Sequence, residues 1–347
     1  MSNTEEHNMP VGVIGSGSFG TAIANLLAEN RDVLLYTRRE EVLQSINEAH
    51  THMGKKLSER IRATTSMEEV GKNCTLIFPI VSSEHFREMM RNLSPHLKPY
   101  HLLIHGTKGL DNTEIDGSIV RDVRTSIHTM SEVIIQESAV RRVGCLSGPN
   151  LSAEIFDGQP TATVVASRFT EVIKAGQDAL RSNRFQVYGS HDITGAELAG
   201  ALKNIIAIGS GMLAGLGMGK NVWALLVNRG LIEMIHLGRA MGADTHAFLG
   251  VAGMADLIAT ASSEKSRNYT FGFRMAKGET LEQILGDMNE VAEGVRTLKI
   301  AQKATDYYKI HTPIVSTLNR VIFTGFPMKK AIEYLMTYPY AVDVDFL

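Results

Sequence analysis

The sequence predicts two domains: an α/β domain with a doubly wound, mainly parallel sheet, followed by an all-α domain. The chain has 347 residues, which is longer than a single hydrophobic core usually grows. In the first half, short apolar runs alternate with helix-like segments, as in βαβ units. After about Gly189 the β-branched runs give way to stretches rich in Ala, Leu, Met and Gly, which favour helices.

The first predicted element is a strand that leads through a glycine-rich turn into a helix. Val11–Ile14 is a short apolar run, and Gly15, Gly17 and Gly20 follow it at once. Residues Thr21–Glu29 are then good helix formers with apolar spacing. The order is therefore strand, tight turn and helix.

The later strands of the first half are predicted from similar apolar runs. Val33–Tyr36 ends in Thr37-Arg38-Arg39 and precedes a helix-like segment, Glu40–Ala49. Further strands are expected at Thr75–Val81, Leu102–His105, Val143–Leu146 and Thr161–Ala166.

The second half is predicted to be helical. Thr194–Gly217 has many small residues that let helices approach closely, and Asn221–Met241 has apolar residues at roughly helical spacing. The change in composition and the turn residues Gly189 to Asp192 predict that the boundary between the two domains lies near residue 192. We expect a flexible tail at residues 1–10, a first domain at residues 11–192 and a helical substrate-binding and catalytic domain at residues 193–347.

Composition excludes several classes of protein. A formal net charge of −2 gives no basic face for nucleic acid. Cys74 and Cys145 are too few for a disulfide framework and fit buried thiols in a reducing cytosol. The N-terminus lacks the features of a signal peptide. Charges such as Lys203 and Glu233 interrupt the most apolar segments, so we expect no membrane span and a soluble, cytoplasmic protein. No metal site is expected.

The turn Gly15-Ser16-Gly17-Ser18-Phe19-Gly20 satisfies the pattern G-x-G-x-x-G between a strand and a helix. The first glycine permits the tight turn, the second lets the backbone approach a pyrophosphate, and the third allows close helix packing. A glycine-rich turn without a ligand is the alternative. The position of the motif favours dinucleotide binding in a Rossmann-like domain.

The end of the second predicted strand bears on the choice of cofactor. A site selective for NAD usually places Asp or Glu there, whereas this chain has Arg38 and Arg39. Guanidinium groups match the 2′-phosphate of NADP. Two solvent-exposed arginines at a helix start are the alternative, so the cofactor is NADP or NAD.

Two lysines are candidates for chemistry. Lys108 directly follows a predicted strand, where residues of an open α/β sheet face the ligand crevice, although a solvated loop lysine is the simpler explanation. Lys203 interrupts an apolar helix rich in small residues. An ammonium group in such surroundings needs a partner or a purpose, unless it reaches solvent along its aliphatic stem.

These motifs together resemble the bacterial NAD(P)-dependent glycerol-3-phosphate dehydrogenases, and the resemblance covers essentially the whole sequence. The segments that carry it are Val11–Ala22, Thr107–Leu110, Leu146–Asn150, Ala201–Gly209, Gly253–Leu257 and Ser266–Asn268. The resemblance implies the reversible, NAD(P)H-dependent reduction of dihydroxyacetone phosphate to sn-glycerol 3-phosphate, which supplies glycerophospholipid synthesis. It also implies a homodimer.

The resemblance further implies roles for individual residues. Lys203 would be the proton donor and acceptor, with Lys108 and Asp256 as further catalytic residues. The implied substrate-binding residues are Lys108, Gly148, Asn150, Lys203, Asp256, Ser266, Arg267 and Asn268. The expected cofactor-binding residues are Gly15, Gly17, Ser18, Phe19, Gly20, Arg38, Arg39, Lys108, Ser152, Arg267, Val291 and Glu293.

The sequence departs from the bacterial pattern at two places. Asn150, Leu151, Ser152 and Ala153 stand where bacterial members commonly read T-F-A-K, so a lysine of that motif is missing. Asn150 is closer to the eukaryotic cytosolic pattern. The family's V-P-S segment is replaced by Ile80-Val81-Ser82, with proline displaced to Pro79.

The chemistry of the reaction agrees with these roles. Reduction of a ketone builds negative charge on its oxygen, which the ammonium group of Lys203 can stabilise and protonate. Arg267 offers a fork of donors to a phosphate. Two other functions remain open: a reductase for a hydroxyacid or ketopantoate, and a protein that senses NADP without turnover.

Overall fold

The computed structural model describes residues 9–113, 126–288, 292–339 and 342–343. Its contacts divide the chain into two compact units: unit 1 comprises residues 1–107 and 130–193, and unit 2 comprises residues 108–129 and 194–347. The first domain was expected at residues 11–192, but of this range the described residues 108–113 and 126–129 group with unit 2. Of the expected flexible tail, residues 1–8 lie outside the described part.

Unit 1 is built on an eight-stranded sheet in the order β12-β11-β10-β7-β6-β1-β2-β5. The strands from β10 to β5 are parallel, and β11 and β12 run in the opposite direction. The predicted mainly parallel sheet is confirmed. The strand bounds are β1 (Val11–Ile14), β2 (Val33–Tyr36), β5 (Ile61–Thr64), β6 (Leu76–Pro79), β7 (Leu102–His105), β10 (Arg142–Ser147), β11 (Thr161–Ser167) and β12 (Phe185–Ser190).

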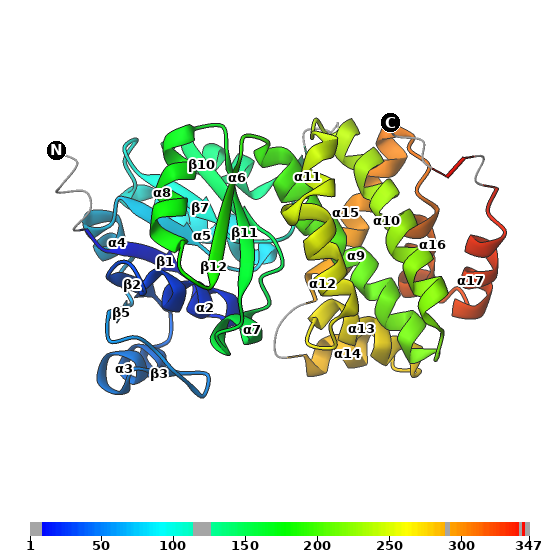
Figure 1. Cartoon of the computed structure of the whole chain (residues 1–347), viewed down its shortest axis with the longest axis horizontal. Coiled ribbons are helices and arrows are strands. Elements are labelled where there is room, and N and C mark those ends of the chain that lie inside the picture. Colours follow the sequence, from blue (N-terminus) through cyan, green and yellow to red (C-terminus); the bar gives the residue numbers. More distant parts are fainter. Residues whose placement is uncertain (1–8, 114–125, 289–291, 340–341, 344–347) are drawn as a thin grey trace. The chain divides into compact units, whose positions relative to one another are not determined.

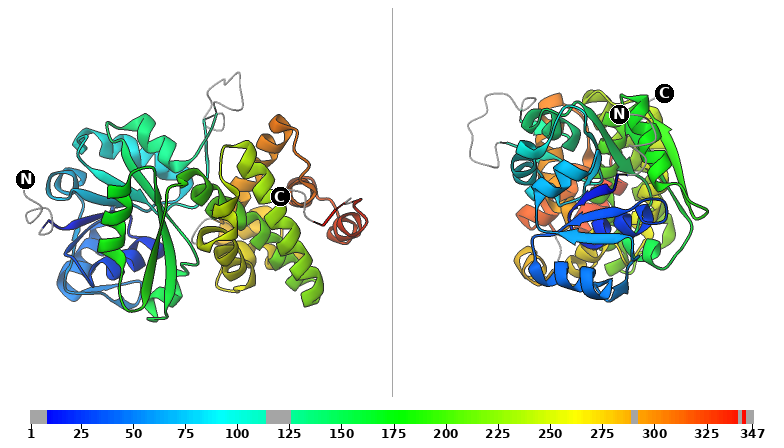
Figure 2. Two further views of the ribbon diagram at one scale, coloured as in Figure 1. Left: turned by 45° about the horizontal axis from the view of Figure 1, so that its top comes forward. Right: turned by 90° about the vertical axis from the view of Figure 1, so that its left-hand side faces the viewer.

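Helices cover both faces of this sheet (Figures 1 and 2). Helices α2 and α8 pack together on one face, and α4, α5 and α6 follow one another on the other face. A small hairpin of β3 (Thr51–His52) and β4 (Lys55–Lys56) follows α3. The helix bounds are α2 (Ser18–Leu27), α3 (Glu40–Ala49), α4 (Met67–Asn73), α5 (Ser83–Leu93), η1 (Ser94–His96), α6 (Met130–Glu137), α7 (Ser152–Phe156) and α8 (Thr170–Leu180).

The doubly wound order creates a switch point between β1 and β6. From β1 the chain proceeds to β2 on one side and later returns to β6 on the other side. Ligands of open α/β sheets bind beyond the carboxyl ends of such strands. Here Gly15 has φ +117°, and a Cβ atom on it would lie 2.1 Å from the Ile80 carbonyl oxygen. A Cβ on Gly20 would lie 2.0 Å from the Gly15 carbonyl oxygen, so both positions require glycine.

Among the described residues of unit 2, the only strands are β8 (Asp111–Asn112) and β9 (Ile127–His128), which pair with each other, and the other regular elements are helices. The two long predicted helices correspond to α9 and α10, which confirms the helical second domain. The bounds are α9 (Ile193–Gly215), α10 (Lys220–Ala240), α11 (Thr245–Leu249), η3 (Val251–Ala255), α12 (Asp256–Ser262), α13 (Arg267–Ala276), α14 (Leu281–Asp287), α15 (Glu293–Tyr308), α16 (Pro313–Thr324) and α17 (Met328–Met336).

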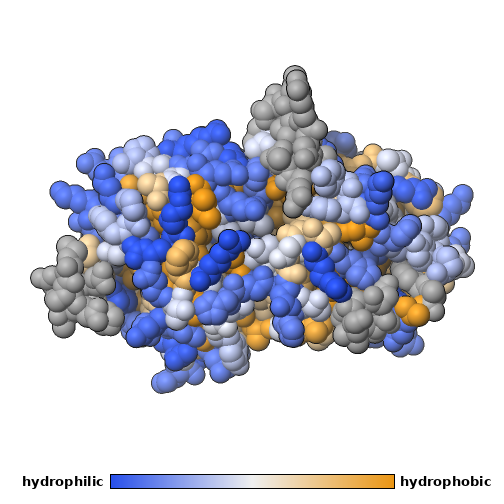
Figure 3. All heavy atoms as spheres, turned by 90° about the horizontal axis from the view of Figure 1, so that it is seen from above, coloured by the Kyte–Doolittle hydropathy of each residue, from blue (hydrophilic) through white to orange (hydrophobic). Residues whose placement is uncertain are grey.

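Helix α9 corrects one expectation about membrane segments. We expected no stretch long and apolar enough to span a bilayer, yet α9 meets both criteria, with a mean hydropathy of 1.3 over an 18-residue window. However, 94% of that window is buried inside the protein. The helix is therefore apolar because it lies in the core of unit 2. On the face of the molecule drawn in Figure 3, hydrophilic residues predominate, and hydrophobic residues form smaller areas among them.

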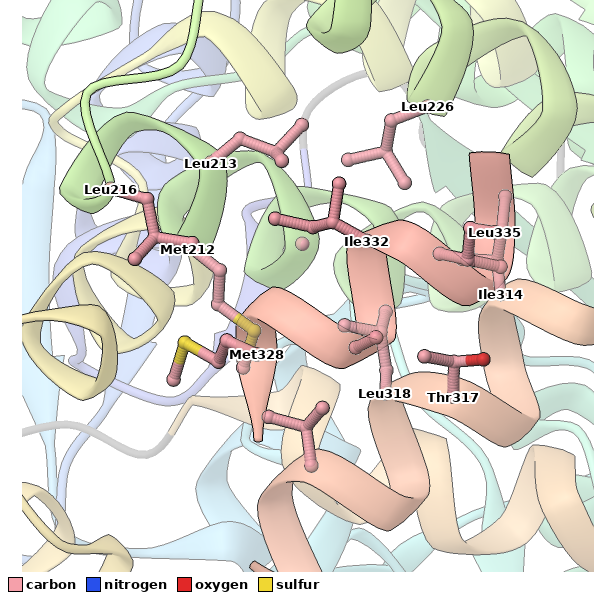
Figure 4. A pocket seen from close by; sticks show the side chains of 13 residues that line it. Met212, Leu213, Leu216, Leu226, Ile314, Thr317, Leu318, Met328, Ile332 and Leu335 are labelled. Atoms are coloured by element: carbon pink, nitrogen blue, oxygen red, sulfur yellow. The ribbon is translucent and has the colours of Figure 1, made fainter. Parts of the chain in front are cut away.

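A small, partly open apolar pocket lies beside α17 in unit 2, and Figure 4 shows the side chains that line it. Apart from Thr317 its lining side chains are apolar. The lining residues are Gly209, Met212, Leu213, Leu216, Leu226, Ile314, Thr317, Leu318, Val321, Met328, Ala331, Ile332 and Leu335.

A buried side-chain carboxyl group of α10 caps the N-terminus of α16. The Glu233 side-chain oxygens accept hydrogen bonds from the backbone N–H groups of Ile314 (2.7 Å) and Val315 (3.0 Å). Such groups have no partner within their own helix. Burial raises the pKa of Glu233 to about 8, although the two N–H donors oppose this shift.

We predict that Glu233→Ala lowers the free energy of unfolding by about 2–4 kcal/mol, because it leaves buried N–H groups unpaired. Glu233→Gln keeps one acceptor and should cost less. At pH values between the pKa of Glu233 in the unfolded chain and its pKa of about 8 in the folded protein, the folded state binds more protons than the unfolded state. Stability of the wild type should therefore fall relative to Glu233→Gln as pH rises through this window. Urea melts at pH 5 and 8.5 test this, and parallel pH curves would contradict it.

Candidate active site

Asp256 is the centre of a charged cluster in unit 2. It begins α12 directly after the π-helical turn η3 and is 1% exposed. Its Oδ1 accepts a hydrogen bond from Lys203 Nζ at 2.5 Å, and its Oδ2 accepts one from Lys108 Nζ at 2.7 Å. One buried carboxylate is therefore paired with two ammonium groups. The structure thus brings together the three residues expected to be catalytic.

Lys203 is held in position by a second partner, Thr260, which was not predicted from the sequence. Its Nζ also donates to Thr260 Oγ1 at 2.5 Å, and Thr260 Oγ1 lies 3.3 Å from Asp256 Oδ1, to which it donates. Thr260 is four residues after Asp256 on the same helix, so that spacing was the available signal. With both contacts, the Lys203 ammonium has a defined direction within the core.

The surroundings of Lys203 favour loss of its proton near neutral pH. Burial lowers the pKa of Lys203 to about 7. The carboxylate of Asp256 opposes this shift, and the positive charge of Lys108 adds to it. A lysine with such a pKa can both donate and accept a proton under ordinary conditions.

Asn204 connects the helix of Lys203 to the segment of Lys108. Its Nδ2 donates to the Lys108 carbonyl oxygen at 3.2 Å. Lys108 is therefore held at its side chain by Asp256 and at its main chain by Asn204. No role for Asn204 was predicted from the sequence.

The N-terminus of α13 carries the residues expected to bind phosphate. Ser266 is its N-cap and accepts from Tyr269 N–H at 3.4 Å. Arg267 is exposed at the first helical position. Asn268 is buried, and its Oδ1 accepts from Gly294 N–H at 2.9 Å. The amide nitrogen of Asn268 is therefore the end that can donate to a ligand, and the helix N-terminus favours an anion.

Glycine contacts fix α13 against the helix of Lys203. A Cβ on Gly211 would lie 1.9 Å from the Tyr269 carbonyl oxygen, and a Cβ on Gly272 would lie 1.9 Å from the Ile208 carbonyl oxygen. No larger residue fits at either position without movement of a backbone. This close approach sets the distance between α9 and the N-terminal residues of α13, which are expected to bind phosphate.

The glycine turn of unit 1 fits the pyrophosphate of a dinucleotide. Gly17 is the N-cap of α2 and makes no side-chain cap bond, and Ser18 and Phe19 are the first helical residues. The first turn of α2 has no acidic residue. The helix N-terminus therefore presents its N–H groups and its positive dipole end to an anion.

Arg38 and Arg39 lie at the carboxyl end of β2, as expected. Both are exposed, and Arg39 is the N-cap residue of α3. Arg39 Nη1 lies 4.0 Å from Glu41 Oε1, and both side chains are more than half exposed. Such a contact is weak, so both guanidinium groups remain suited to an incoming phosphate.

The segment after β10 carries the expected Gly148, Asn150 and Ser152. Gly148 has φ +154°. Asn150 Nδ2 donates to Thr163 Oγ1 at 2.9 Å, while its buried Oδ1 has no hydrogen-bond partner in the described part of the chain. Ser152 begins α7. Asn150 thus offers a free acceptor despite the departure from the bacterial motif.

The remaining expectations concern two residues near α15. Glu293 is the first residue of α15 and is partly buried. Val291 lies outside the described residues. The expected residues therefore divide between the units: the glycine turn, the arginines after β2 and the segment after β10 belong to unit 1, and Lys108, Lys203, Asp256, Ser266, Arg267, Asn268 and Glu293 belong to unit 2.

The two cysteines, Cys74 and Cys145, are both buried and form no disulfide. Burial raises the pKa of Cys74 to about 12. A thiol with such a pKa is a poor nucleophile. Within the described ranges, no group of three His, Cys, Asp or Glu residues could hold a metal ion.

Two family models match the chain. Residues 10–173 match the N-terminus of NAD-dependent glycerol-3-phosphate dehydrogenase, and residues 192–333 match its C-terminus. Among curated relatives, the glycerol-3-phosphate dehydrogenase [NAD(P)+] of Saccharophagus degradans is 39% identical over 99% of this chain and 94% of its own length. That of Teredinibacter turnerae is also 39% identical, over 98% of each chain.

Solved structures agree with these matches. Glycerol-3-phosphate dehydrogenase from Coxiella burnetii superposes with a TM-score of 0.85 at 26% identity, over 95% of this chain and 99% of that one. A ketopantoate reductase from Ralstonia eutropha shares the fold, with a TM-score of 0.58 at 15% identity over 94% of this chain and all of that one. Because the family models together span most of the sequence, the chain belongs to the family of NAD-dependent glycerol-3-phosphate dehydrogenases.

Proposed function

We propose that this protein catalyses the reversible, NAD(P)H-dependent reduction of dihydroxyacetone phosphate to sn-glycerol 3-phosphate. The observation that carries the proposal is the buried cluster of Lys203, Asp256 and Lys108. A positioned ammonium group with a pKa near 7 is suited to the protonation of a ketone oxygen. The names of the relatives support the same reaction.

The two units would divide the work. Unit 1 would hold the dinucleotide through its glycine turn, Arg38, Arg39 and Ser152, whereas unit 2 would hold the substrate and the catalytic lysines. Lys108, Arg267, Val291 and Glu293 would also contact the cofactor. The support is the resemblance to the family, together with the anion-binding character of the α2 N-terminus.

The residues of this chain would assist hydride transfer by controlling charge and protons. The nicotinamide dinucleotide, when bound, supplies the hydride to the substrate ketone carbon or accepts it from the alcohol carbon. Lys203 stabilises the negative charge that develops on the ketone oxygen and donates its proton there. In the reverse direction its neutral amine accepts the hydroxyl proton. Asp256 and Thr260 keep the amine in position in both directions.

The substrate phosphate would bind at the N-terminus of α13. Arg267 offers a charged fork of donors, and Asn268 offers its amide nitrogen because its oxygen is engaged by Gly294. Ser266 offers its hydroxyl hydrogen while its oxygen caps the helix. Gly148 and Asn150 of unit 1 would complete the set of substrate residues. Phosphate recognition of this kind distinguishes the proposed substrate from a ketoacid.

We also propose that the enzyme is a cytoplasmic homodimer that supplies glycerophospholipid synthesis. The resemblance to the family supports this proposal. Sedimentation of the purified chain tests the assembly.

The first test of the function is a substrate comparison. We expect the purified protein to oxidise NADPH or NADH with dihydroxyacetone phosphate and to show little activity with 2-ketoacids such as ketopantoate. The physical reason is the donor set of α13, which matches a phosphate dianion. Absorbance at the nicotinamide band measures the rate. Turnover of a ketoacid alone would reject the proposal, and binding of NADPH without any turnover would favour a sensor.

Arg38 tests the choice of cofactor. We expect Arg38→Ala to weaken NADPH much more than NADH, because only NADPH carries a 2′-phosphate for the guanidinium group. Fluorescence titration gives both dissociation constants, with Arg62→Ala, an exposed arginine of β5, as the matched control. Equal losses for the two cofactors would show that Arg38 does not read this phosphate.

Lys203 tests the mechanism. We expect Lys203→Met to lower kcat by roughly 10² or more, the scale of one general acid or oxyanion donor. NADPH binding should change little, and the protein should stay folded because Lys108 still neutralises Asp256. Steady-state rates, a cofactor titration and a thermal melt on one preparation measure these effects.

The matched control for Lys203 is Lys329→Met, which removes an exposed lysine of α17. It should leave all three measurements unchanged.

In the wild type, kcat/KM for ketone reduction should fall as pH rises above about 7, because the proton of Lys203 is then lost. A well-folded Lys203→Met enzyme with near-normal kcat would exclude Lys203 from the mechanism.

A further inference from the structure

The hairpin of β3 and β4 contacts the glycine turn through a buried histidine. The His52 side chain lies at the end of β3, and the residue is 8% exposed. Its Nε2 lies 2.8 Å from the carbonyl oxygen of Ser16, the residue between Gly15 and Gly17. A carbonyl oxygen can only accept, so Nε2 carries a hydrogen and donates it.

This hydrogen bond fixes the direction of a neighbouring N–H group. The Ser16 carbonyl and the Gly17 N–H belong to one planar, trans peptide unit, in which they point in opposite directions. Gly17 is the N-cap of α2, at the end of the helix that attracts anions. When His52 holds the carbonyl on one side, the Gly17 N–H must point to the other side.

A second contact holds the same residue through its side chain. Ser16 Oγ lies 2.9 Å from Thr37 Oγ1, within hydrogen-bond distance. Thr37 is 1% exposed, and its Oγ1 also accepts from the Arg39 backbone N–H at 3.3 Å. Ser16 is therefore held at its main chain by the hairpin and at its side chain by the end of β2.

We propose that His52 is a positioning residue for the dinucleotide pyrophosphate, a role that rests on the proposed cofactor binding. By holding the Ser16 carbonyl it pre-orients the Gly17 N–H toward the pyrophosphate. Without this donor, the peptide must be ordered during binding, which weakens affinity. NADPH and NADH share the pyrophosphate, so His52 acts on both cofactors alike. In this it differs from Arg38, which acts through the 2′-phosphate.

The test compares three substitutions of His52 in the full-length protein. His52→Met and His52→Asn lose the contact, because methionine has no donor and the asparagine amide is too short. His52→Gln places an amide N–H near the position of Nε2. We expect Met and Asn to raise the dissociation constants of NADPH and NADH by a similar factor of roughly 10, the scale of one hydrogen bond. Gln should restore most of the affinity.

Adenosine 2′-phosphate separates positioning from general damage. It has the adenosine and the 2′-phosphate but no pyrophosphate, so its competition with NADPH should give the same inhibition constant in all His52 variants. The control Lys55→Met removes the ion pair between the hairpin and Asp157, which measures 3.0 Å, and leaves His52 in place. It should bind both dinucleotides like the wild type. Thermal melts accompany every titration.

These experiments distinguish a failure of the proposed role of His52 from a failure of the proposed function. Three results would each overturn the role of His52. The first is an unchanged NADPH dissociation constant in His52→Met and His52→Asn, and the second is a loss of affinity for adenosine 2′-phosphate equal to that for NADPH. The third is a failure of His52→Gln to restore NADPH affinity. These results would leave the proposed function intact if the wild type binds both dinucleotides. Failure of the wild type to bind either one would overturn the proposed function and this inference together.

Discussion

The buried carboxylate of Asp256 is the constraint on which the proposed active site depends. An isolated charge at 1% exposure would be costly. Two ammonium groups compensate it, and it in turn compensates Lys203, which is 4% exposed. If one lysine is removed, the other still compensates Asp256, whereas removal of Asp256 would leave Lys203 buried without a compensating charge. The segment of Lys108 therefore belongs with unit 2 by contact, although it follows a strand of unit 1 in sequence.

The apolar character of α9 and the lowered pKa of Lys203 have one origin, which is the burial of this helix. The same helix is hydrophobic enough to span a bilayer and is almost completely buried. Those surroundings disfavour the charged form of the lysine and lower its pKa to about 7. Glycines make the burial possible, because Gly211 and Gly272 let α9 and α13 meet at their backbones.

The proposed cofactor site of unit 1 depends on backbone geometry, whereas the proposed catalytic cluster of unit 2 depends on buried charges. The positive φ of Gly15 and the close approach of Gly20 to the Gly15 carbonyl leave no room for a side chain at either position. The contacts of Ser16 with His52 and Thr37 then restrict the turn between these glycines. A turn ordered before binding loses less entropy when an anion arrives.

The sequence by itself predicted six of the eight strands of the sheet, the glycine turn, the helical second half and the candidate lysines, but it did not predict the edge strands β5 and β12. The predicted features depend on local spacing, on φ angles open to glycine, or on a charge within an apolar helix. Only the tertiary structure decided that Lys108 pairs with Asp256, 148 positions away, that Thr260 completes the cluster, and that His52 reaches Ser16. The sequence carries little signal for such contacts, because they depend on how distant segments pack and not on the pattern within either segment.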